Sequence, residues 1–170
     1  MRRAVAIAGI TILISALGSM LVSAAGAKTA AAFQWTVKYT FGVPASRPCD
    51  HFQCGEGTVV GFGDATSTVE LTSVSGPIGG TTNCFLVTAD ETITLTSDGS
   101  TLRLEEPGTG CLPGNSIKAP FPLPVDAEGT FTVKHGSGVF QGAKGSGTFE
   151  CKMAAGDQQH CTFSGTLTLP

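Results

Sequence analysis

The segment from Cys49 to Cys54 brings two thiols, one imidazole and one carboxylate together within six residues (Cys-Asp-His-Phe-Gln-Cys). Two thiolates and an imidazole are ligands that suit zinc, but a structural zinc site needs a fourth ligand, and no residue stands out as one. In an oxidising compartment the two thiols pair with each other instead. We therefore predict a disulfide and no metal site here, and we interpret His160 beside Cys161 in the same way.

His135 is the candidate for acid–base chemistry. It has the same alternation parity as Phe131 and Val133, which would point its ring toward the interior or its rim. An imidazole in that place could exchange a proton or orient a ligand. The alternative, which we favour, is that Gly136 begins a turn and the ring lies exposed at a barrel mouth.

Two further polar residues could join His135 only if the fold brought them together. Glu91 shares parity with Ile93 and Leu95, but it begins an expected strand, where an exposed end is expected. Tyr39 lies on another strand. The chain has no Gly-x-Ser-x-Gly elbow, phosphate loop or His-Glu-x-x-His motif, so no catalytic residue is assigned beyond the candidate His135. No cofactor is expected.

The first residues have the three parts of a secretory signal. Arg2 and Arg3 precede an apolar run over residues 4–22, and Ala25-Gly26-Ala27 supplies small residues for cleavage. We predict a signal peptide over residues 1–27 and one secreted domain over residues 28–170. The apolar run is close to the length that spans a bilayer, so a retained signal anchor is the alternative.

Charge excludes several classes of partner. The chain has 13 acidic and 10 basic residues, of which Arg2 and Arg3 leave with the signal, so the mature domain carries −5. No basic cluster remains, which argues against nucleic acid and, after cleavage, against a membrane surface. The sequence does not predict an oligomeric state.

All six cysteines follow the signal. An even number in an exported domain indicates disulfides, and sequential pairing places two bridges beside expected hairpins. The predicted pairs are Cys49–Cys54, Cys84–Cys111 and Cys151–Cys161.

Apolar and polar residues alternate along most of the mature chain, in segments rich in Thr, Val, Phe and Ile. The expected strands are Phe33–Phe41, Gly57–Phe62, Ser67–Val74, Cys84–Thr88, Glu91–Thr96, Thr101–Glu105, Gly129–Lys134, Ser146–Lys152 and Cys161–Leu169. This pattern predicts an all-β fold, a single antiparallel barrel of about eight strands, with a sandwich as the alternative. Residues 106–124 hold five prolines, from Pro107 onward, and are expected to form a loop that covers one barrel end.

The segment Gly136-Ser-Gly-Val-Phe-Gln-Gly-Ala-Lys-Gly145, followed by Gly147-Thr-Phe149, resembles the glycine motif of the allene-oxide-cyclase and dirigent-like barrel superfamily. The likeness is greatest to small secreted bacterial members of unassigned function. It implies an eight-stranded antiparallel barrel in which this motif links two strands near the end. The catalytic residues of the plant enzymes have no counterparts that can be placed on this sequence, so the resemblance implies a fold and no activity.

We therefore expect a secreted, non-catalytic barrel. If its lumen is open, it would bind an apolar small molecule against the aromatic residues Trp35, Tyr39, Phe131 and Phe149. One alternative is a cyclase- or dirigent-like enzyme that uses His135. Another is a cell-envelope structural or interaction protein that acts through the proline-rich loop.

Overall fold

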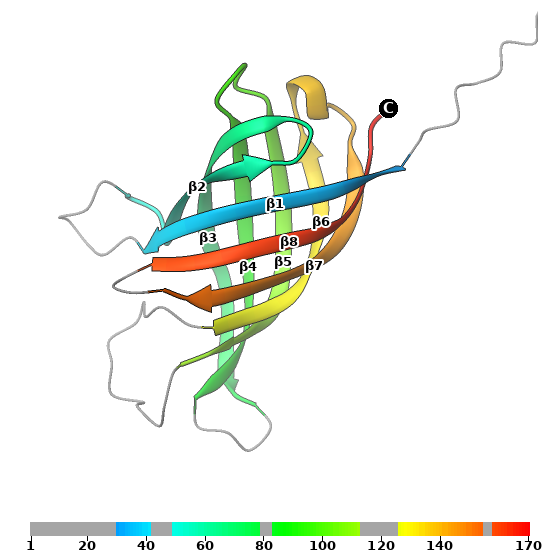
Figure 1. The fold of residues 1–170 in the computed structure, drawn as a ribbon. Helices are drawn as coiled ribbons and strands as arrows, with labels where there is room; N and C mark the ends of the chain where they lie inside the picture. Colours follow the sequence, from blue (N-terminus) through cyan, green and yellow to red (C-terminus); the bar gives the residue numbers. More distant parts are fainter. Residues whose placement is uncertain (1–29, 42–48, 79–82, 113–125, 155–157) are drawn as a thin grey trace, which may run out of the picture.

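A computed structural model describes residues 30–41, 49–78, 83–112, 126–154 and 158–170. Its strands close into one antiparallel barrel in which each strand pairs with its neighbours in the chain and β1 pairs with β8 (Figure 1). The strands are β1 (Ala30–Phe41), β2 (Gln53–Val59), β3 (Gly63–Pro77), β4 (Cys84–Leu95), β5 (Thr101–Cys111), β6 (Asp126–Gly136), β7 (Lys144–Met153) and β8 (Gln158–Thr168). The predicted barrel is confirmed, and the sandwich is excluded.

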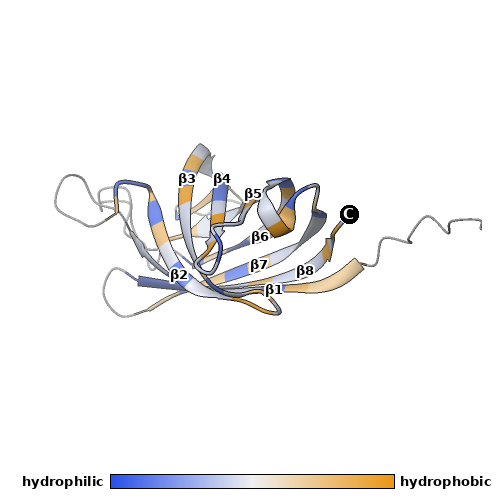
Figure 2. Cartoon of the chain, turned by 90° about the horizontal axis from the view of Figure 1, so that it is seen from above, coloured by the Kyte–Doolittle hydropathy of each residue, from blue (hydrophilic) through white to orange (hydrophobic). Residues whose placement is uncertain are grey.

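Alternation along the strands places one set of side chains in the lumen. In β1, Phe33, Trp35, Val37 and Tyr39 are at most 2% exposed, and the residues between them face outward. Hydrophobic and hydrophilic bands also follow one another along β2, β3 and β4 (Figure 2). The core is therefore the inside of the barrel. Among the described residues, no helix is long and apolar enough to cross a membrane.

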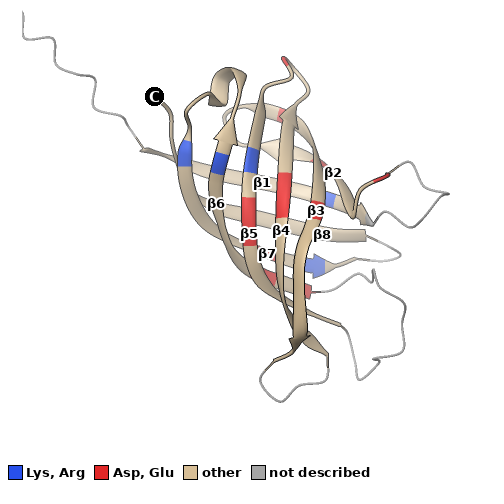
Figure 3. Ribbon diagram, turned by 180° about the vertical axis from the view of Figure 1, so that it is seen from behind, with Lys and Arg blue, Asp and Glu red and all other residues tan. Residues whose placement is uncertain are grey.

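Basic residues on β5 and β6 lie near acidic residues on β4 and β5 (Figure 3). Arg103 of β5 forms an ion pair with Asp90 of β4, and Lys134 of β6 forms one with Glu105 of β5, at 2.7 Å. The outer surface here therefore mixes both signs of charge.

The two segments expected at 84–88 and 91–96 form the single strand β4. Its pairing with β5 is continuous from Cys84–Cys111 to Thr94–Thr101, so Asp90 lies within the ladder and does not break it. Glu91 consequently lies inside the strand with no exposed surface. The prediction of an exposed Glu91 was wrong, because the strand begins seven residues earlier.

The expectation that Pro107 excludes a strand was also wrong. β5 continues through it to Cys111. Proline lacks an N–H donor, and the β5–β6 pairing stops at Glu105–Thr132 and resumes at Gly108–Gly129, so this ladder is interrupted around the proline. Most of the predicted proline-rich loop, like the predicted signal peptide, lies outside the described residues.

The structure contains the three predicted disulfides, Cys49–Cys54, Cys84–Cys111 and Cys151–Cys161. Two of them join register partners on adjacent strands, β4 to β5 and β7 to β8. All three lie at the barrel end where β1, β5 and β7 finish. Each contributes about 2–4 kcal/mol, and the shortest loop contributes least.

The glycine motif forms the corner between β6 and β7, at the opposite barrel end. Its short turn η1 (Gly138–Phe140) inserts the fully buried Phe140 ring against Phe62, with ring centroids 4.8 Å apart. Gly138 (φ 59°) and Gly142 (φ 72°) have left-handed backbones that favour glycine. At Gly136 a Cβ would lie 2.2 Å from the Phe140 carbonyl oxygen. The motif thus closes this end of the lumen.

Candidate ligand-binding site

A pocket of about 70 Å³ lies inside the barrel end that carries the disulfides. Most of its walls are apolar side chains that point inward from strands far apart in the sequence. They include Phe52, Leu71, Phe85, Leu112, Phe149 and Phe163. Phe149 and Phe163 are stacked, with centroids 5.4 Å apart. The lumen is therefore packed at the η1 end, whereas at the disulfide-bearing end it has room for a small chemical group.

Four polar side chains also line the pocket: Tyr39, Gln53, Glu106 and Gln159. Gln53 Nε2 donates a hydrogen bond of 2.8 Å to Gln159 Oε1, which joins β2 to β8. Gln53 is 6% exposed and Gln159 is 3% exposed. A buried amide pair of this kind is a fixed polar group in an otherwise apolar wall.

A buried carboxyl cluster lies deeper in the lumen beside Glu106. Glu91 Oε1 accepts hydrogen bonds from Trp35 Nε1, at 3.2 Å, and from the Tyr39 hydroxyl. Three oxygens of the cluster are buried without a protein hydrogen-bond partner: Glu91 Oε2, Glu106 Oε1 and Ser67 Oγ. Such orphan groups are rare in folded proteins because each costs about 1–3 kcal/mol. Three such oxygens in one cluster make this part of the lumen a candidate site.

Burial controls the protonation of the cluster. It raises the pKa of Glu106 well above the usual value, and the neighbouring charge of Glu91 raises it further. Burial also raises the pKa of Glu91, although polar contacts with Glu106, Tyr39, Ser67 and Trp35 oppose that shift. The pKa of Tyr39 is raised well above its usual value, first by burial and then by the Glu91 charge. The pocket therefore holds a carboxyl group whose surroundings favour its neutral form.

Two of the four predicted ligand-lining residues, Tyr39 and Phe149, line this pocket. Trp35 and Phe131 are not among its lining residues; they are 0% and 1% exposed and belong to the packed core. Phe131 packs against Phe33 and Phe163, with centroids 5.5 and 5.9 Å away. Trp35, the other predicted residue outside the pocket wall, donates a hydrogen bond to Glu91 in the buried cluster.

His135 lies on the outer surface. It therefore does not share the inward orientation of Phe131, although the two residues have the same alternation parity in the sequence. Leu104 pairs with Val133 while Arg103 pairs with His135, which leaves Lys134 as one extra residue in β6. This β-bulge reverses the alternation after Val133. His135 is consequently exposed, in agreement with the favoured alternative, and it does not join Glu91 and Tyr39.

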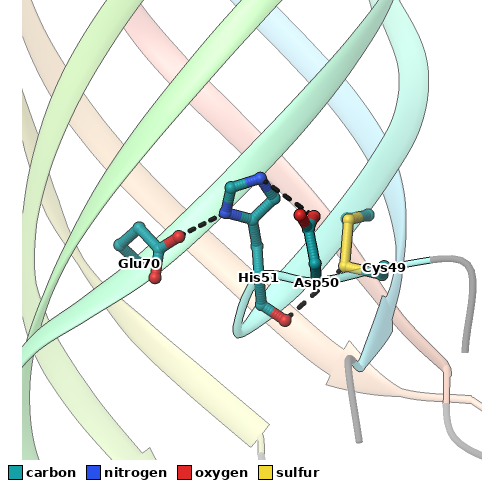
Figure 4. A network of polar contacts seen from close by, with 5 residues as sticks. Cys49, Asp50, His51 and Glu70 are labelled. Atoms are coloured by element: carbon teal, nitrogen blue, oxygen red, sulfur yellow. Dashed lines mark hydrogen bonds and ion pairs between the residues drawn. A yellow bond between two sulfur atoms is a disulfide. The ribbon is translucent and has the colours of Figure 1, made fainter. Parts of the chain in front are cut away.

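The Cys49–Cys54 segment forms a surface cluster that its disulfide closes (Figure 4). His51 Nδ1 contacts Glu70 of β3, and Nε2 lies 3.3 Å from Asp50 Oδ1. The hydrogen bond with Glu70 raises the pKa of His51. The disulfide removes both thiols as ligands, and in the described part of the chain no group of three or more His, Cys, Asp or Glu side chains could hold a metal ion.

The sequence analysis did not identify Glu106, because the prolines from Pro107 onward led us to expect a loop over residues 106–124. The available signal was parity: Leu102, Leu104 and Glu106 are spaced by two, and all three are buried on the lumen face of β5. Sequence reasoning also missed the amide pair of Gln53 and Gln159, which lies at strand ends beside cysteines.

Comparison with known proteins gives no relative from which an activity could be transferred. No protein-family model matches the chain, and neither a curated protein nor a solved structure matches it significantly. The function therefore has to be argued from the site.

Proposed function

We propose that this protein is an exported, non-catalytic β-barrel that binds one small, mainly apolar molecule at the disulfide-bearing end of its lumen. The observation that carries the proposal is the pocket itself. Aromatic and aliphatic walls surround a few fixed polar groups, and one lining residue, Glu106, has a buried oxygen without a hydrogen-bond partner. This combination is typical of small-molecule sites in proteins.

The size of the pocket limits the ligand. Its volume of about 70 Å³ compares with roughly 30 Å³ for one water molecule in the liquid, so it holds a small head group. The remainder of a ligand would extend toward the barrel end, between Phe52 and Leu112. An eight-stranded barrel interior is just wide enough for side chains or one small ligand, which favours a slender molecule.

Export is part of the proposal. The three disulfides fit an extracellular protein, since such bonds persist in oxidising compartments. The predicted signal peptide over residues 1–27 would direct the chain to the secretory pathway.

The proposal is tested by native mass spectrometry of protein purified from its own host. We expect an additional non-covalent mass that organic solvent releases. Ala89→Leu, which adds volume to a pocket wall, should prevent its retention, whereas Thr92→Leu on the outer face of the same strand should not. A wild-type protein that carries no ligand and binds none of a panel of apolar compounds would refute the proposal.

The enzyme alternative keeps the proposed kinship with allene-oxide-cyclase and dirigent-like barrels, which the closed eight-stranded topology supports. Its candidate residue is poorly placed, because His135 is exposed and does not line the lumen pocket. Recovery of a chemically altered compound after incubation would favour this alternative, whereas recovery of the unchanged compound favours binding. The loop invoked for an envelope interaction protein lies mostly outside the described residues.

A further inference from the structure

The buried cluster contains two carboxyl oxygens and one hydroxyl oxygen that have no hydrogen-bond partner. Tyr39 and Trp35 both donate to Glu91 Oε1, which leaves Glu91 Oε2 and Glu106 Oε1 without a donor. Glu106 is only 6% exposed and lines the pocket. A ligand that supplies N–H or O–H donors at this point would remove the cost of the orphan acceptors.

The cluster also lacks a positive charge. The structure describes five lysine and arginine side chains, and each is exposed on the outside of the barrel: Lys38, Arg103, Lys134, Lys144 and Lys152. None of the described residues therefore brings a cation to Glu91 and Glu106. Buried carboxylates in proteins are paired or coordinate metals, and an ammonium group is one such partner.

We infer that the pocket selects a slender apolar molecule with a primary amine, and that the carboxyl group of Glu106 holds the ammonium group. The inference rests on the proposed function and specifies its ligand class. An ammonium group supplies three donors, whereas an alcohol supplies one. The stacked rings of Phe149 and Phe163 line the same pocket, and aromatic rings attract cations.

Binding of an ammonium ion should release a proton, because Glu106 must ionise to pair with it. The titratable groups that influence Glu106 are Glu91 and Asp90 of β4 and Tyr39 of β1, all acids. On the adjacent strand β6 the inward positions are Gly129, Phe131 and Val133, which do not titrate, while Glu128, Lys134 and His135 face outward. Since the groups that influence Glu106 within the described part of the chain are acids, affinity for an amine should rise with pH.

The test compares three probes of equal chain length by isothermal titration calorimetry at about pH 8: hexylamine, 1-hexanol and hexanoate. A charge-assisted hydrogen bond in a desolvated site should make hexylamine bind about tenfold more tightly than hexanol, with hexanoate weakest. Hexylamine affinity should rise by up to about tenfold per pH unit while Glu106 is protonated in the free protein, and titrations in two buffers should reveal the released proton.

Two variants of adjacent residues test whether the preference for the amine depends on Glu106 itself or on the net charge of the protein. Glu106→Gln should make hexylamine and hexanol bind alike, because it removes the carboxylate that pairs with the ammonium group. Glu105→Gln removes the same charge from the outer face of β5, where Glu105 pairs with Lys134, and should keep the wild-type preference for the amine. Circular dichroism establishes that both variants are folded.

The results distinguish the ligand class from the proposed function. If hexanol binds as tightly as hexylamine, or if Glu106→Gln retains the preference for the amine, the amine inference is overturned and the binding function stands. If none of the three probes binds to the wild-type protein and its host-purified form carries no ligand, both fail.

Discussion

At the η1 end of the barrel aromatic rings fill the lumen, whereas at the disulfide end carboxyl and amide groups line a pocket. Phe140 is fully buried against Phe62 at the first end. At the second end Glu106 and Gln159 are buried to a similar degree, yet a cavity remains. One barrel thus contains a packed end and an incompletely packed end.

The disulfides are placed unevenly between these ends. All three lie at the pocket end, and Cys151 is itself part of the pocket wall. Packing stabilises the η1 end without covalent help, because its turns are short and its rings are in contact. Where a pocket interrupts packing, cross-links supply the missing stability by restricting the unfolded chain. The pocket end thus combines incomplete packing with all three cross-links.

The largest expected effect is at the packed end. Phe140→Ala removes a fully buried ring and should destabilise the fold by about 3–5 kcal/mol, measured by denaturant unfolding. Hexanol affinity should change little under conditions where the variant is folded, since Phe140 lies at the other end. A large loss of affinity in folded Phe140→Ala would mean that the two ends are not independent.

At the pocket end, replacing both Cys151 and Cys161 by Ala should cost about 2–4 kcal/mol of stability. Here affinity should fall as well, because Cys151 lines the pocket and the bridge ties β7 to β8. Unfolding and calorimetric titration of one preparation measure both effects. Unchanged affinity would remove the link between cross-linking and the shape of the pocket.

Glu106→Gln should stabilise the protein at high pH. The raised pKa of Glu106 means that the folded state binds its proton more tightly than the unfolded state does. The contribution of Glu106 to the stability of the wild-type protein is thus fully present below the unfolded pKa of about 4.5. It decreases as pH rises toward the folded pKa. The variant does not titrate, so its advantage should grow to about 1–3 kcal/mol near pH 8. Thermal unfolding from about pH 4 to 9 measures it, and a constant difference contradicts the assignment.

The smallest effect concerns the surface cluster at His51. The hydrogen bond with Glu70 raises the pKa of His51. The stability that this bond adds to the fold is therefore present below the unfolded pKa of about 6.5 and is lost as pH rises through the folded pKa. His51→Ala should cost about 0.5 kcal/mol at acidic pH and almost nothing in alkali. Glu70→Gln should lose the same pH-dependent part. Equal costs at both pH values would show that the ion pair does not contribute.

Sequence by itself determined the local features of this protein. Alternation in Phe33–Phe41 predicted β1, and sequential cysteine pairing predicted all three disulfides. The glycines of the motif predicted a strand-linking corner, because left-handed backbones at Gly138 and Gly142 are a local requirement. These inferences succeeded because neighbouring residues alone decide which face a side chain occupies within one strand.

Only the tertiary structure decided the site. Glu91 and Tyr39 are 52 residues apart, and barrel closure and strand register bring them into contact, which no local pattern records. Glu106 became a pocket residue because β5 continues through Pro107. The bulge at Lys134 turned His135 outward, since one extra residue reverses a period of two. Side-chain parity is local, but register, bulges and closure depend on partner strands, so the chemistry of the lumen emerged only from the assembled barrel.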